Sequence, residues 1–170
     1  MRKLAWISAA LLLLITPGMA GCGALNPASE GFAIYMPHDG ITASEMASLS
    51  HYELAKSPVI SLIDIISYAK DTHEIELTAR AYARITEPII QLSGKVFVVC
   101  VDKKPIYWGA FWAPFSSQSF DGVTIWVPSM ENGNVVRLRL GYPSPDFYRG
   151  KDPRSNPEIF QSLKKAGKLR

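Results

Sequence analysis

The sequence has few of the residue patterns that mark a catalytic or metal site. Its three histidines, His38, His51 and His73, lie far apart and form no His-x-His pair, so the close ligand spacing of zinc sites is missing. The serines of the segment "PFSSQSFDG" lack the Gly-x-Ser-x-Gly turn of serine hydrolases. These absences predict a protein that is not an enzyme and holds no metal or cofactor.

Cysteine is also scarce, because the chain has only Cys22 and Cys100. A reactive cysteine needs neighbours that stabilise its thiolate and some access to solvent. Cys100 instead lies in the apolar run "VFVVCV", so we expect it in the core. With Cys22 modified as described below, Cys100 has no partner and no intramolecular disulfide is expected.

Charge is low overall and unevenly distributed. The formal net charge of the full chain is +3, which is too small to favour nucleic acid as a partner. Residues 137–170 contain nine basic and three acidic side chains, whereas residues 22–136 contain seven basic and twelve acidic ones. The basic end is therefore expected either to dock on the acidic body or to be attracted to anionic lipid head groups.

The one long apolar run lies at the N-terminus. Arg2 and Lys3 precede the apolar stretch from Leu4 to Ile15, which has the length of a signal-peptide core and is short for a membrane span. The motif Met19-Ala20-Gly21-Cys22 that follows resembles the lipobox of bacterial lipoprotein precursors. The resemblance implies cleavage before Cys22 and attachment of acyl chains such as palmitate to its thiol and amino group.

This resemblance predicts three parts: a signal peptide (1–21), a lipidated tether (22–31) and a single domain (32–170). Each methylene buried in lipid contributes about 0.8 kcal/mol, so two or more acyl chains anchor a protein stably. Gly23, and not Asp, follows the cysteine, which by the same resemblance implies the outer membrane, facing the periplasm, of a Gram-negative cell. In a Gram-positive cell the anchor would lie in the outer face of the cell membrane.

The order of expected strands and helices in the domain predicts a mostly antiparallel α+β fold with about six or seven strands and two or three helices. Short strands are expected at residues 32–36 and 59–61, and a hairpin at residues 64–78. Thr42 and Glu45 form a capping box, Thr78 caps a helix at "ARAYARIT", and Asn156 and Gly167 bound a last helix. The continuous apolar run of residues 95–102 predicts a strand covered on both faces.

The stretch from Pro58 to Ile125, including "EIELTARAYARI" and "GKVFVVCVDKKPIYWGAFW", resembles the periplasmic head region of SecD-type protein-export subunits. The resemblance implies a ferredoxin-like module that contacts exported chains. The transmembrane helices that carry the proton-linked work of that family have no counterpart in this sequence, so the motor function does not transfer.

Aromatic residues are concentrated in the hairpin at residues 105–115. Strand alternation places Trp108 and Trp112 on one face and Tyr107 and Phe111 on the other, with Phe115 beyond the strand end. Both core packing and an exposed binding surface fit this pattern. We therefore expect a protein or peptide partner at these five residues, or alternatively a small ligand or glycan.

The lipobox generates a first prediction. Replacing Cys22 with alanine removes the thiol that would be acylated, so the Cys22→Ala chain should remain as an unprocessed or mislocalised precursor. Mass spectrometry of the membrane fraction measures this directly. An unmodified mature wild-type protein that starts at another residue would contradict the lipobox assignment.

Overall fold

The computed structural model describes residues 30–87 and 93–170. The predicted lipobox with Cys22, the predicted signal peptide and most of the predicted tether lie outside these residues. The elements follow in chain order: β1 (Phe32–Tyr35), α1 (Ala43–Met46), η1 (Leu62–Asp64), β2 (Ile65–Ala69), β3 (Glu74–Leu77), α2 (Ala79–Thr86), β4 (Val96–Val101), β5 (Lys104–Trp112), β6 (Phe120–Trp126), β7 (Val135–Tyr142), η2 (Pro145–Phe147) and α4 (Pro157–Lys165).

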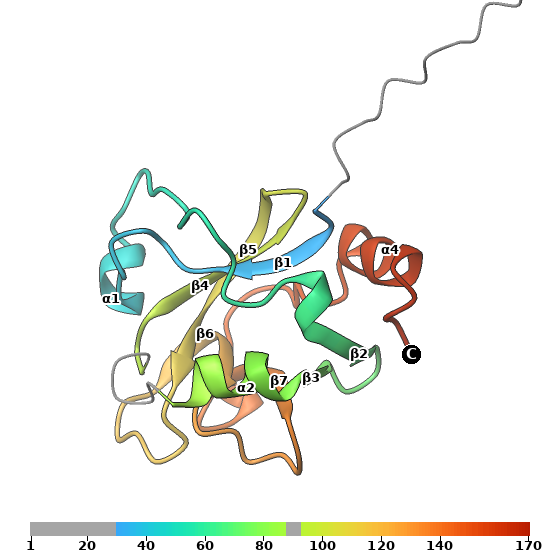
Figure 1. The fold of residues 1–170 in the computed structure, drawn as a ribbon. Coiled ribbons are helices and arrows are strands. Elements are labelled where there is room, and N and C mark those ends of the chain that lie inside the picture. Colours follow the sequence, from blue (N-terminus) through green and yellow to red (C-terminus); the bar gives the residue numbers. More distant parts are fainter. Residues whose placement is uncertain (1–29, 88–92) are drawn as a thin grey trace, which may run out of the picture.

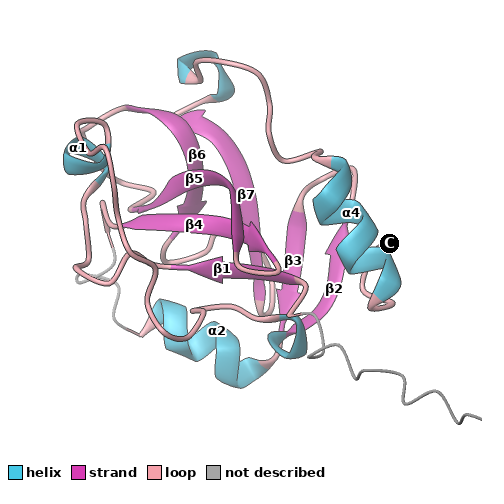
Figure 2. Cartoon of the chain, turned by 90° about the horizontal axis from the view of Figure 1, so that it is seen from above, coloured by secondary structure: helices cyan, strands magenta, loops and turns pink. Residues whose placement is uncertain are grey.

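These strands form one seven-stranded sheet in the order β1-β4-β5-β6-β7-β3-β2 (Figure 1). All neighbours are antiparallel except β5 and β6, which run parallel. The sheet is strongly curled, so that β3 and β2 stand across β1 and β4 (Figure 2). The α+β class with a mostly antiparallel sheet is thereby confirmed. Within residues 58–125, β3 precedes α2 and neighbours β7 and β2 but not β5, so these strands are not paired as in a ferredoxin-like module.

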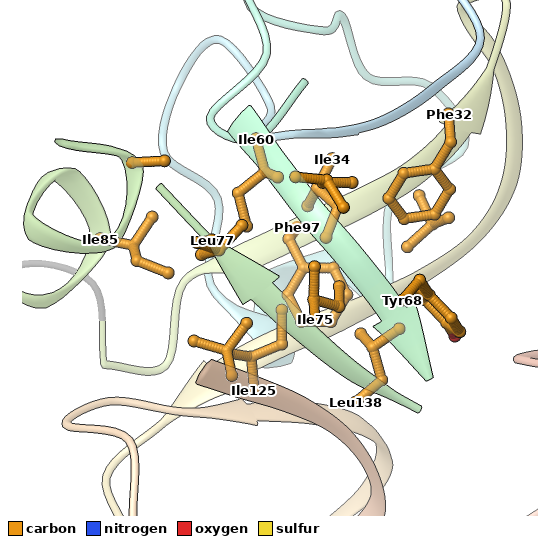
Figure 3. Packing of buried hydrophobic residues seen from close by; sticks show 14 of the residues in the cluster. Phe32, Ile34, Ile60, Tyr68, Ile75, Leu77, Ile85, Phe97, Ile125 and Leu138 are labelled. Atoms are coloured by element: carbon orange, nitrogen blue, oxygen red, sulfur yellow. The ribbon is translucent and has the colours of Figure 1, made fainter. Parts of the chain in front are cut away.

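The curled sheet encloses the main hydrophobic core. Apolar side chains from its inner face and from α2 converge there (Figure 3), and all of the following are buried: Phe32, Ile34, Tyr68, Ile75, Leu77, Ile85, Phe97, Ile125 and Leu138. The run that forms β4 faces this core with Phe97 and Val99 and a second cluster on the outer face with Val98 and Cys100. Burial on both faces explains why its sequence is continuously apolar.

Both outer strands of the sheet are covered. On the β1 side, Ile34 exchanges backbone hydrogen bonds with Val59 and Ile60. On the β2 side, Tyr68 donates its N–H to the Lys168 carbonyl at 2.7 Å and accepts from the Arg170 N–H at 2.9 Å. Covered edges protect a sheet from pairing with other chains.

The C-terminal segment, from Ser162 to Arg170, therefore joins the two outer strands. Its first residue accepts the Phe32 N–H of β1 on its Oγ at 2.8 Å, and its last residues bond to β2. Ile159 and Leu163 of α4 are fully buried between them. The basic end of the chain thus docks on the domain, and in Figure 1 α4 lies beside β1 and β2.

Most local elements agree with the sequence-based expectations. The capping box at Thr42 and the caps at Thr78 and Asn156 are present, and β2 and β3 form the expected hairpin. Residues 59–61 are an exception, because Ile60 makes only an isolated bridge to Ile34. The two apolar residues Val59 and Ile60, next to Pro58, cover the edge of β1 without continuing as a strand.

This closure generates a second prediction. Leu163→Ala should lower the free energy of unfolding by about 2–5 kcal/mol, because it leaves a cavity where α4 meets the core. Lys164→Ala, at the exposed neighbouring position, should change it by no more than about 0.5 kcal/mol. Urea denaturation of the two variants gives the comparison. Equal stability of Leu163→Ala and the wild type would show that α4 does not close the core.

Candidate functional site

The structure divides the predicted aromatic surface between the two faces of β5. Tyr107 and Phe111 point inward, and Phe111 is 0% exposed, with its ring centroid 5.3 Å from that of Phe97. Trp108 and Trp112 point outward. The five predicted residues therefore do not form one surface, and Phe111 is removed from it because it fills the core.

The outward tryptophans are largely covered by their neighbours. Trp112 stacks on Phe120 at a centroid distance of 5.1 Å, and Trp126 meets Tyr142 edge to face at 5.7 Å. Trp126 and Tyr142 were missing from the predicted set because strand pairing, and not sequence distance, brings them beside the hairpin. Together they leave Trp112 only 7% exposed.

The connection between β5 and β6 completes this cover. Because the two strands are parallel, residues 113–119 return along the outer face of the sheet. Tyr142 donates its hydroxyl to the carbonyls of Pro114 and Ser116, each at 3.0 Å, and Trp112 donates Nε1 to the Gln118 carbonyl at 3.2 Å. Phe115 is left 77% exposed on this connection.

The inward Tyr107 has an unusual hydroxyl. Within residues 30–87 and 93–170, it is one of four buried side-chain polar atoms that have no hydrogen-bond partner. Burial raises the pKa of Tyr107 well above its ordinary value. Tyr107 and Trp108 line a hollow of about 360 Å³ together with Tyr148 and Pro153. Tyr107 thus combines a hydroxyl that has no partner among the described residues with a position on the wall of this hollow.

No nucleophile or metal site emerges from the described part of the chain. Cys100 is fully buried, and burial raises its pKa to about 11, so its thiol is uncharged at neutral pH. His73 is buried, its pKa is lowered by that burial, and its Nδ1 lies 3.0 Å from the Tyr68 hydroxyl. No group of three or more His, Cys, Asp or Glu side chains is arranged to hold a metal ion within that part.

A further concave site lies at the edge of β7. We call it the edge groove; its volume is about 430 Å³, and it is lined by Asp71, Thr72, Trp126, Arg137, Leu138, Arg139, Leu140, Gly141, Pro143, Ser144, Pro145 and Arg154. Five consecutive residues of β7 belong to this set. Successive side chains of a strand point to opposite faces of the sheet. A wall that includes side chains from both faces therefore lies along the edge of the strand.

The edge is open here because β3 is shorter than β7. β3 pairs with β7 only as far as Glu74 opposite Arg137, and the next bond runs from the Leu138 N–H to the His73 carbonyl at 3.0 Å. Before His73, whose φ is 55°, the chain turns away into β2. Residues two apart on a strand direct their backbone groups to the same side, so the Leu140 N–H points into the groove.

Paired charges form the outer wall of the edge groove. Arg137 and Arg139 both bond to Glu131, and the Arg139 guanidinium lies 4.2 Å from the ring centroid of Trp126. Arg154 binds Asp152 with two hydrogen bonds, at 2.9 and 2.7 Å, and thereby lowers the pKa of that carboxyl. Glu74 also pairs with Arg137, so three carboxylates balance the three guanidinium groups of this wall.

The remaining wall groups suit a peptide. Arg154 also donates Nη1 to the Leu138 carbonyl at 2.8 Å, which fixes this end of the open edge. Trp126 Nε1 is buried and has no partner among the described residues. An open strand edge beside Trp126, Leu140 and Pro143 can accept a backbone and one apolar side chain. Sequence patterns did not indicate this site, since it depends on the different lengths of two paired strands.

No helix in the described residues is both long and apolar enough to cross a membrane. Comparisons with protein-family models, with curated proteins and with solved structures found no match for this chain.

Proposed function

We propose that this chain is a lipid-anchored, non-catalytic cell-envelope protein whose domain binds an extended peptide segment of a protein partner. Acylated Cys22 would hold it in the outer membrane, facing the periplasm, of a Gram-negative cell, or in the outer face of a Gram-positive cell membrane. The observation that carries the binding proposal is the edge groove, where β7 extends beyond β3.

Peptide addition to a strand uses backbone hydrogen bonds for affinity and side-chain pockets for specificity. The edge groove offers the Leu140 N–H and an apolar wall that includes Trp126 and Leu140. The two outer strands of the sheet are already covered, by Ile60 and by Leu169 respectively. The open part of β7 is therefore the place where an additional strand meets the least obstruction.

The second candidate function is the binding of a small ligand at the aromatic hairpin. The buried hydroxyl of Tyr107, beside the hollow next to Trp108, favours it. Replacing Tyr107 with phenylalanine distinguishes the two. It would weaken a ligand held by that hydroxyl, and it would leave peptide binding at the edge groove unchanged.

The peptide proposal is tested by photocrosslinking in cells. A photoreactive residue at Thr72, on the exposed rim of the edge groove, should form a covalent adduct with one envelope protein, mapping to a single extended segment. The same residue at Ser117, exposed on the β5–β6 connection, is the control and should not form this adduct.

A substitution that blocks the rim of the edge groove provides a second test of the peptide proposal. Thr72→Trp places a large side chain at the rim and should reduce binding of the mapped segment, made as a synthetic peptide, by roughly tenfold or more. Ser117→Trp should leave that affinity unchanged. Adducts of equal yield at Thr72 and Ser117, or a peptide affinity that Thr72→Trp does not change, would contradict binding at the groove.

A further inference from the structure

We infer that the surface around Gly31, where the tether enters the domain, lies against an anionic lipid surface. We call it the exit surface and define it by Ile63, Arg80, Lys103, Lys104 and Lys165. The inference rests on the proposed acylation of Cys22. It adds an orientation: one end of the domain faces the lipid, and the opposite end faces away.

The position at which the tether enters is fixed by hydrogen bonds. Gly31 donates its N–H to Asp102 Oδ1 at 2.7 Å, and its carbonyl accepts the Asp102 N–H at 2.9 Å. Its φ is 71°, and a Cβ atom there would lie 2.4 Å from Leu62 Cδ1. The chain thus enters between the β4–β5 turn and η1 in a conformation that favours glycine.

The length of chain before Gly31 limits how far the domain can move from its anchor. Nine residue steps separate Cys22 from Gly31, and a fully extended chain spans roughly 3.3–3.6 Å per residue. The anchor therefore holds the exit surface within about 30 Å of the head groups. At Gly31 the chain leaves the domain, so this end is the one held nearest to the lipid.

Basic side chains surround this point. Lys103 and Lys104 are exposed on the β4–β5 turn next to Asp102. Lys165 of α4 lines a hollow together with Asp102 and Ser162, and Arg80 of α2 lines another together with Glu30. Each basic side chain close to an anionic surface strengthens attachment by roughly fivefold.

An exposed apolar side chain accompanies them. Ile63 of η1 is 87% exposed and lines the same hollow as Glu30 and Arg80. An aliphatic side chain rimmed by cations is suited to the boundary between head groups and acyl chains. An isoleucine side chain that is exposed to water does not stabilise the domain.

The acidic residues of this surface are hydrogen-bonded or paired with basic side chains. Asp102 accepts the Gly31 N–H, Glu30 accepts the Tyr35 hydroxyl, Asp64 pairs with Arg84, and Glu158 lies 3.4 Å from Lys104. Lysine stems are long enough to extend beyond these carboxylates toward a membrane. The arrangement therefore favours phosphatidylglycerol or another anionic lipid over a zwitterionic one.

Site-specific fluorescence tests the orientation on the full acylated chain. Ile63→Cys and Met130→Cys each receive a fluorophore. Cys100 stays unlabelled in the native state because it is buried. Met130 is 66% exposed, and Figure 1 places the β6–β7 connection at the end of the molecule opposite the β4–β5 turn. The protein is reconstituted into vesicles of phosphatidylethanolamine and phosphatidylglycerol that carry a nitroxide on the lipid head group.

The label at Ile63 should be quenched more strongly than the label at Met130, because the exit surface is held against the anionic head groups. Combining Lys103→Glu with Lys165→Glu should reduce quenching at Ile63 in these vesicles, and pure phosphatidylcholine should do the same. Equal quenching of the two labels on protein that floats with the vesicles would overturn the orientation alone. Protein that does not float would instead overturn the acyl anchor, and the orientation with it.

Discussion

The hydrogen bonds that join the C-terminal segment to both outer strands hold the curled sheet closed. Ser162 binds β1, and Lys168 and Arg170 bind β2. A sheet curled this strongly would otherwise expose two strand edges and its apolar interior. Ile159 and Leu163 fill the space between the edges, so a short helix that is marginal alone becomes stable through packing. The position of Gly31 also depends on this contact, since Ser162 lies next to it.

Closure of the two outer strands leaves the partial edge of β7 as the proposed site for a peptide partner. The turn at His73, which precedes β3, leaves β7 without a partner strand beyond Leu138, and this opens the edge groove. The aromatic residues beside the groove stabilise the fold, because they cover the outer face of the sheet; they are Trp112, Phe120, Trp126 and Tyr142. Within this cover Trp126 belongs both to the packed cluster and to the wall of the edge groove. The packed cluster thereby holds the groove wall in place.

Local chemistry explains which features could be predicted from the sequence. The cap at Thr78, the β2–β3 hairpin and the doubly covered β4 depend on neighbouring residues, and each was predicted. The parallel pairing of β5 and β6 could not be predicted, because a seven-residue return is shorter than the usual crossover between parallel strands. Residues 113–119 bury Trp112. The alternation of side chains along β5 did not decide whether Trp112 is buried or exposed. The edge groove depends on where β3 ends against β7, which no local pattern encodes.

Native-state hydrogen exchange, measured residue by residue, tests the account most directly. The closed sheet predicts slow exchange for the amides of Tyr68 and Lys70, which bond to the C-terminal segment, and of Leu138, which bonds to His73. The open edge predicts that the Leu140 amide exchanges much faster than that of Leu138. Fast exchange at Tyr68 and Lys70 would contradict the closure. Exchange at Leu140 as slow as at Leu138 would contradict the open edge on which the proposed peptide site depends.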